Sequence, residues 1–174
     1  MTKLILHIGF AKTGTTTLQH CFEKSRDTLA NHGVLYPQTV FESQHVMVIP
    51  YLMGAKAAPD WVAQQFKDEV ELEKRAKQAW DDVCEGIRHM RPDTVILSSE
   101  QLGDMTHHPQ FPAAIEQLSS IFDELIIVAY VREPVSEYVS YAQEQLKAGF
   151  QPLTPDRMAS AKYRLAPLTQ CTNA

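Results

Sequence analysis

Short apolar runs alternate with longer segments of helical periodicity along this chain. Four runs of mainly apolar residues are present, at residues 4–8, 34–36, 94–98 and 125–131. Such runs are typical of strands that are covered on both faces of a sheet. Apolar residues at intervals of three and four predict helices in the segments 15–33, 60–91, 110–122 and 134–148. Strands that alternate with helices predict an α/β fold, a parallel sheet flanked by helices in a single domain over residues 1–174.

The same periodicity predicts which helix faces turn toward the core. One face of the first helix carries Leu18, Cys21, Phe22, Ser25 and Leu29. In the segment 60–91 the predicted inward positions are Val62, Phe66, Val70, Ala76, Trp80, Val83, Cys84 and Ile87. We expect both sets of side chains to pack against the sheet.

Polar segments follow the three clearest strands directly. These segments are Gly9–Thr16, Ser98–Glu100 and Arg132–Glu133. Ligands of parallel sheets bind beyond the carboxyl ends of the strands, and these ends meet at one edge. The sequence therefore predicts that three chemical groups from distant parts of the chain converge on one site.

The loop after the first strand has the composition of a phosphate-binding loop. Gly9 and Gly14 stand in G-x4-G spacing, and glycine permits backbone angles that point successive N–H groups at one anion. The helix that follows adds its positive N-terminal end. Thr15, Thr16 and Thr17 can donate hydroxyl hydrogen bonds to phosphate oxygens. This combination favours a phosphorylated ligand over a simple glycine-rich turn.

The position of the lysine separates this loop from that of nucleotide hydrolases. Thr15 stands where the G-x4-G-K-[ST] pattern has its lysine, and Lys12 lies inside the loop instead. A lysine there suits stabilisation of charge on a bridging oxygen as a leaving group departs. No clear metal-binding aspartate follows a strand, which also argues against a phosphate-loop kinase or nucleotide hydrolase.

A second anion-binding pair follows the strand at 125–131. Arg132 stands at the end of this strand, and Ser140 comes eight residues later, two turns along the predicted helix. The two side chains can share one side and grip a phosphate, the guanidinium by a charge-assisted fork and the serine by its hydroxyl. Pro134 shapes the turn between them.

Glu100 is the candidate general base, since it follows a strand at the predicted edge. Ser98 and Ser99 could orient Glu100 or a ligand. Three histidines are rival candidates for the general base: His45, His107 and His108. His7 lies inside a strand and is expected to be a packed, hydrogen-bonded residue.

Charge and composition narrow the classes of function. The net charge of −5 disfavours a broad nucleic-acid-binding surface and still permits a local basic pocket. Cys21, Cys84 and Cys171 form no CxxC pair and fit a reducing compartment. The apolar runs are far shorter than the roughly 20 residues of a membrane-spanning helix. We therefore expect a cytoplasmic protein without a membrane span, and the spacing of its residues indicates no metal site.

Residues His7–Leu18 resemble the 5′-phosphosulfate-binding loop of sulfotransferases that use 3′-phosphoadenosine 5′-phosphosulfate (PAPS). The Arg132-x-Pro turn with Ser140 is similar to the 3′-phosphate-binding motif of that family. The position of Glu100 looks like that of the base in family members that use glutamate. The resemblance implies a P-loop-like sulfotransferase fold, PAPS as co-substrate and adenosine 3′,5′-bisphosphate (PAP) as product.

The resemblance also assigns roles to single residues. It implies that Lys12 assists catalysis and that Arg132 and Ser140 hold the 3′-phosphate. It implies that the loop residues in contact with the phosphosulfate are Gly9, Ala11, Lys12, Thr13, Gly14, Thr15, Thr16 and Thr17. The acceptor is a hydroxyl or amine of open class: glycan, lipid, small alcohol or peptide.

The resemblance covers residues 4–19, 94–102 and 125–148, the first half of the family fold. The later segment of the family has no match here, which predicts a chain without the C-terminal part of that fold. Two alternatives stay open beside a sulfotransferase. One is a phosphate-loop kinase or nucleotide hydrolase, and the other is a non-catalytic module that binds 3′,5′-phosphorylated adenosine.

Overall fold

The computed structural model describes residues 1–10, 12–38, 40–41, 43–147 and 149. Over these residues a four-stranded parallel sheet forms the centre of the protein, in the order β2-β3-β1-β4. Its strands are β1 (Lys3–His7), β2 (Val34–Leu35), β3 (Thr94–Ser98) and β4 (Glu124–Val128). All four lie where the apolar runs predicted strands, and the α/β prediction is confirmed.

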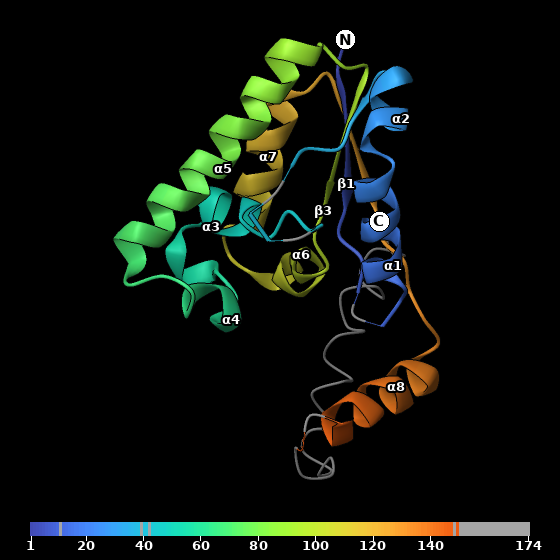
Figure 1. The fold of residues 1–174 in the computed structure, drawn as a ribbon. Coiled ribbons are helices and arrows are strands. Elements are labelled where there is room, and N and C mark those ends of the chain that lie inside the picture. Colours follow the sequence, from blue (N-terminus) through green and yellow to red (C-terminus); the bar gives the residue numbers. More distant parts are fainter. Residues whose placement is uncertain (11, 39, 42, 148, 150–174) are drawn as a thin grey trace.

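Helices cover both faces of this sheet. The helices are α1 (Thr15–Lys24), α2 (Arg26–Asn31), α3 (Val48–Met53), α4 (Asp60–Ala63), α5 (Glu69–Met90), α6 (Gln101–Asp104), α7 (Phe111–Ile121) and α8 (Pro134–Lys147), with short 3₁₀ turns at Ala55–Ala57 and Met105–His107. Helices α1 and α2 lie on one face, and α3, α5 and α7 lie on the other, whereas α8 lies apart beyond the carboxyl ends of the strands (Figure 1). No helix in the described ranges is long and apolar enough to cross a bilayer.

The side chains of β1 and β3 alternate between the two faces of the sheet, and the polar pair at the strand ends lies on the face opposite the leucines. Leu4 and Leu6 pair with Val95 and Leu97 of β3 and are fully buried in the core with α5 and α7. The next pair in the register, His7 with Ser98, ends both strands with polar side chains. Because successive side chains of a strand alternate between faces, this pair lies on the α1 side.

The segment 60–91 forms two helices rather than the single one predicted. Asp68 interrupts the helical hydrogen bonding and caps α5, since its carboxylate accepts a hydrogen bond from the backbone N–H of Glu71 at 2.9 Å. Val70, which the periodicity placed inward, is 74% exposed in the first turn of α5. The predicted inward face is correct further along, where Ala76, Trp80 and Val83 are buried.

The first predicted helix is also divided, at Ser25, and its buried face differs from the prediction. Cys21 is exposed, whereas Thr15 and Gln19 are the buried residues of α1. The reason is that α1 packs over the polar ends of β1 and β3, where polar side chains find partners. Apolar periodicity alone could not show this.

Strand β4 is the least covered strand of the described sheet. It ends at Val128, three residues before the predicted end, and pairs along one side with β1. Ile127 is 46% exposed, and Tyr130 and Val131 after the strand are exposed as well. The longest apolar run of the sequence is thus at the edge of the sheet rather than in its centre.

Candidate functional site

The carboxyl ends of β1, β3 and β4 form one edge of the sheet, which we call the rim. Two hydrogen bonds join the segments that follow these strands. The hydroxyl of Thr15 donates to Oε2 of Glu100 at 2.5 Å, and Nη1 of Arg132 donates to the carbonyl of Lys12 at 3.1 Å. The structure therefore brings together all three segments that the sequence placed at one edge.

The loop between β1 and α1 has an unusual backbone. Lys12 has φ of 66° and Gly14 has φ of 88°, both in the left-handed region. A non-glycine residue in this region is uncommon, and such residues cluster at functional sites. The hydroxyl of Thr13 donates to the carbonyl of Phe10 at 2.6 Å and closes the base of the loop.

The N-terminus of α1 is open to an anion. Gly14 precedes the helix without capping it by a side chain, and the first turn contains no acidic residue. The first helical hydrogen bond runs from the N–H of Leu18 to the carbonyl of Gly14 at 3.1 Å. The N–H groups of the first turn, residues 15–17, thus have no intrahelical acceptor, as at any helix start. Such N–H groups and the helix dipole favour a bound phosphate or sulfate.

Two glycines permit the close packing beneath this loop. A Cβ atom on Gly9 would lie 2.7 Å from Cγ2 of Thr15 and 2.9 Å from Nε2 of His7. A Cβ atom on Gly103 would lie 2.6 Å from the carbonyl oxygen of Ile8 and 2.9 Å from that of Gly9. Helix α6 therefore presses directly on the backbone where β1 turns into the loop.

A buried polar layer supports the loop from below. Ser98 is its centre: Nδ1 of His7 lies 2.8 Å from Oγ of Ser98, and Nε2 of Gln19 donates to the same oxygen at 3.0 Å. All three side chains are buried. Such a network fixes β1, β3 and α1 relative to one another, because each broken bond would leave a buried polar group unpaired.

His45 extends this layer and is committed to the fold. Its N–H donates to the carbonyl of Ser98 at 2.7 Å, and its Nδ1 accepts the N–H of Ser98 at 3.1 Å. Nε2 lies 3.1 Å from the carbonyl of Pro37, so the ring is neutral with its proton on Nε2. Burial lowers the pKa of His45 to about 4. His45, one of the rival bases, therefore has both ring nitrogens occupied.

His7 has one ring nitrogen without a partner among the described residues. This atom, Nε2, is buried and lies beside Gly9 at the start of the loop. The rings of His7 and Tyr130, which follows β4, pack in a T-shaped arrangement with centroids 5.5 Å apart. Burial lowers the pKa of His7, which keeps the ring neutral beneath the loop.

The threonines of the loop divide into two groups. Thr15 is 3% exposed, and its hydroxyl is directed at Glu100, whereas Thr16 and Thr17 are exposed at the start of α1. Ser99 donates its hydroxyl to the side chain of Gln101 at 3.0 Å. Among the described residues, the hydroxyls of Ser98 and Ser99 form their hydrogen bonds with side chains other than that of Glu100. Ala11, which the resemblance also assigned to the site, lies outside the described residues.

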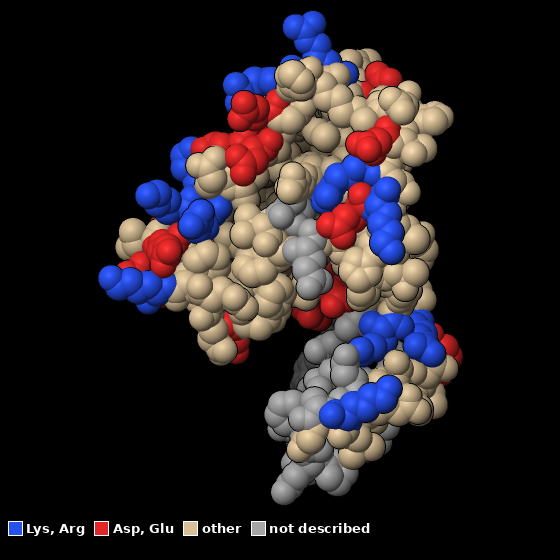
Figure 2. Space-filling model, in the orientation of Figure 1, with Lys and Arg blue, Asp and Glu red and all other residues tan. Residues whose placement is uncertain are grey.

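The β4 side of the rim is more open. Arg132 is exposed, and its hydrogen bond to the carbonyl of Lys12 sets it beside the loop. Basic side chains are visible over the junction between the body of the protein and α8 (Figure 2). Ser140 is half-buried within α8, and the structure describes no hydrogen bond between it and Arg132. That Arg132 and Ser140 together bind one phosphate stays a prediction.

The other two rival bases, His107 and His108, precede α7. His107 is exposed in the turn Met105–His107, and Nδ1 of His108 accepts the N–H of Gln110 at 3.3 Å, close to the start of α7.

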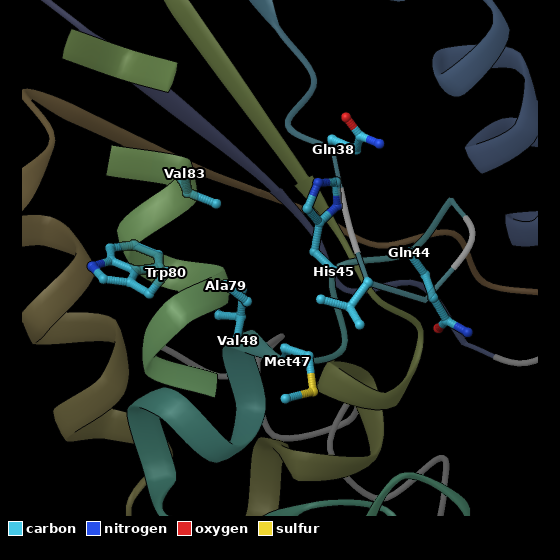
Figure 3. A pocket seen from close by; sticks show the side chains of 9 residues that line it. Gln38, Gln44, His45, Met47, Val48, Ala79, Trp80 and Val83 are labelled. Carbon is cyan, nitrogen blue, oxygen red and sulfur yellow. The ribbon is translucent and has the colours of Figure 1, made fainter. Parts of the chain in front are cut away.

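A mainly apolar pocket lies away from the rim, between α5 and the segment that leads into α3 (Figure 3). His45 lines it together with Met47, Trp80 and Val83.

Two residues of the site escaped the sequence reasoning. Apolar periodicity does not predict that Gln19 is buried, although a glutamine in the helical turn after the three threonines is a polar signal. Gly103 lies three residues after Glu100 within a helix, where glycine is unfavourable unless close packing requires it. That signal was present in the sequence.

No protein-family model, curated protein or solved structure matches this chain.

Proposed function

We propose that this protein is a sulfotransferase that binds PAPS at the rim and transfers its sulfuryl group to a hydroxyl or amine. The observation that carries the proposal is the meeting of three strand ends, through the Thr15–Glu100 and Arg132–Lys12 hydrogen bonds. An uncapped helix start and a carboxylate lie there beside a loop that contains a lysine. These are the groups that an acid–base transfer from a phosphosulfate requires.

Each group has a distinct part in the proposed reaction. The 5′-phosphosulfate lies in the loop, where the N–H groups of the first turn of α1 and the hydroxyls of Thr16 and Thr17 bind its oxygens. The acceptor oxygen attacks sulfur while Glu100 takes its proton. The bond from sulfur to the bridging oxygen breaks, and Lys12 stabilises the electron pair that leaves with PAP. Arg132 binds the 3′-phosphate from the β4 side.

A phosphate-loop kinase or nucleotide hydrolase is less well supported. Position 15 of such a loop would need a lysine that reaches the terminal phosphates, and here a buried threonine bonded to a carboxylate occupies it. The acceptor of the sulfuryl group can be a glycan, a lipid, a small alcohol or a peptide.

A thermal-shift titration with PAP tests the nucleotide proposal. Because PAP would bind the native state alone, a concentration of about 100 times its Kd raises the free energy of unfolding by about 2.7 kcal/mol. ATP with Mg²⁺ should produce a smaller shift at equal concentration. A larger shift with ATP and Mg²⁺ than with PAP would favour the kinase class instead.

Substitution of Lys12 tests catalysis separately from binding. We expect Lys12→Ala to lower the release of PAP from PAPS by about 10²- to 10³-fold, the usual cost of removing one positioned group that stabilises a leaving charge. Lys24→Ala, an exposed lysine at the other end of the same helix, is the matched control. Binding of PAP without any turnover of PAPS over a panel of sugar, lipid, alcohol and peptide acceptors would identify a non-catalytic module.

A further inference from the structure

The shortest side-chain link across the rim joins the loop to the carboxylate of Glu100. Thr15 begins α1, and Glu100 directly precedes α6, 85 positions later in the chain. Their oxygens are 2.5 Å apart, within the range of a hydroxyl that donates to a charged carboxylate. Such charge-assisted bonds are roughly twice as strong as bonds between neutral groups.

The rotamer of Thr15 is set by its surroundings. Its methyl group, Cγ2, lies against Gly9, where even one added carbon atom would approach it to 2.7 Å. A β-branched side chain has few allowed χ1 values in a helix, so a fixed methyl group also fixes the hydroxyl. The side chain is almost fully buried, which prevents water from competing for that hydroxyl. The packing of the loop thus aims the hydroxyl at Glu100.

A hydroxyl has a single proton to donate. While the hydroxyl of Thr15 donates to Glu100, it cannot also donate to an oxygen of a bound phosphosulfate. The exposed hydroxyls of Thr16 and Thr17 are not subject to this restriction. The resemblance of the loop to a family motif suggested one shared role for the three threonines, and the geometry separates them.

We propose that Thr15 is a positioning residue that holds the carboxylate of Glu100 for proton transfer, rather than a ligand of the nucleotide. This inference rests on the proposed sulfotransferase function. The bond to Oε2 fixes the plane of the carboxylate and leaves Oε1 to accept the proton of the acceptor. That proton moves to Oε1 as the acceptor oxygen bonds to sulfur, and the bridging oxygen leaves with its electron pair on PAP. The phosphate loop then aligns the base and the bound nucleotide in one rigid unit.

The test separates turnover from nucleotide affinity in two variants of one residue. Thr15→Val keeps the shape of the side chain and removes the donor, whereas Thr15→Ser keeps the donor. The rate is measured as release of PAP from PAPS with water as the acceptor, and affinity is measured by calorimetric titration of PAP. We expect Thr15→Val to lower kcat by about tenfold to hundredfold with little change in the Kd of PAP. Thr15→Ser should recover most of the lost rate.

Two further variants protect the result from a folding defect. Glu100→Gln leaves the loop untouched and should lower kcat at an unchanged Kd, and Thr15→Val should then lower kcat little further in the Glu100→Gln background. Thr28→Val changes an exposed threonine of α2 and serves as the matched control. If Thr15→Val does not fold, Thr15→Ala removes the donor in its place, and full additivity of Thr15→Ala and Glu100→Gln overturns the proposal.

The outcomes are distinguishable from failure of the proposed function. An intact wild-type chain that does not bind PAP refutes the sulfotransferase itself, and the role of Thr15 with it. Given binding and turnover by the wild-type chain, a loss of PAP affinity in Thr15→Val assigns Thr15 to the phosphate and overturns the inference. An unchanged kcat in Thr15→Val overturns it as well.

Discussion

At the ends of β1 and β3 the polar side chains of the rim are buried and bonded to one another, whereas at the end of β4 they are exposed. His7, Ser98, Gln19 and His45 form a closed layer beneath the loop. On the other side, Arg132 reaches the loop through one hydrogen bond to a backbone carbonyl. Ser140 belongs to α8, which lies apart from the helices that cover the sheet (Figure 1).

This difference in burial indicates that the phosphosulfate and the 3′-phosphate of the proposed nucleotide would contact two different kinds of surface. The half of the rim that would hold the phosphosulfate is already arranged in this structure, and little conformational entropy would be lost there on binding. The half that would hold the 3′-phosphate presents an exposed Arg132 and the helix α8, which lies apart from the sheet. Binding energy from the 3′-phosphate would then serve to assemble the site around the reacting group.

Acid should destabilise the buried polar layer at the ends of β1 and β3, and this is the largest effect on stability that we expect. The pKa of His45 is lowered by burial from 6.5 to about 4 in the folded chain, so the unfolded chain takes up a proton first as the pH falls. The contribution of neutral His45 to the free energy of unfolding is complete above pH 6.5, and it is lost as the pH falls from 6.5 to about 4. The loss amounts to about 3 kcal/mol in the free energy of unfolding.

Urea unfolding at a series of pH values measures this loss. His45→Asn, whose side-chain oxygen can still accept the N–H of Ser98, should be less stable at pH 7 and should show a flatter decline in acid. His89→Asn, at the end of α5, is the matched control, since His89 is exposed. An equally steep decline in His45→Asn would show that other groups cause the acid sensitivity, with His7 the first to test.

The sequence predicted the order of the elements and the convergence at the rim because these depend on local apolar runs and on the direction of parallel strands. It predicted Glu100 and Arg132 as site residues because charged residues directly after a strand are conspicuous, and Lys12 because it lies within the glycine-rich loop. It did not predict the layer around Ser98. The hydrogen bonds from His7 and Gln19 to Ser98 connect positions 91 and 79 residues apart, and no local pattern encodes them. The division of α1 and the outward turn of Val70 also depend on tertiary packing.

Substitution of Arg132 should have the next largest effect, on nucleotide affinity, and it tests the role of the exposed side of the rim at the end of β4. A hydrogen bond to a charged group is worth about 1.5–3 kcal/mol, so Arg132→Gln should weaken PAP binding by roughly tenfold to hundredfold. Binding of adenosine 5′-monophosphate, which lacks the 3′-phosphate, should change far less. Calorimetric titration of both nucleotides measures the difference, with exposed Arg75→Gln on α5 as the control. An equal loss for both nucleotides would mean that Arg132 acts by holding the carbonyl of Lys12.

Ser140 should produce the smallest effect, because a neutral hydroxyl contributes only about 0.5–1.5 kcal/mol through a hydrogen bond. We expect Ser140→Ala to weaken PAP binding about twofold to tenfold, and exposed Ser119→Ala on α7 to leave it unchanged. Hydrogen exchange adds a structural readout. PAP should slow exchange in α8 much more than in β1 and β3, since the latter strands are already held by the buried layer. Equal protection of both halves, or none in α8, would mean that the 3′-phosphate is bound without α8 and that the two halves of the rim do not differ in the way proposed.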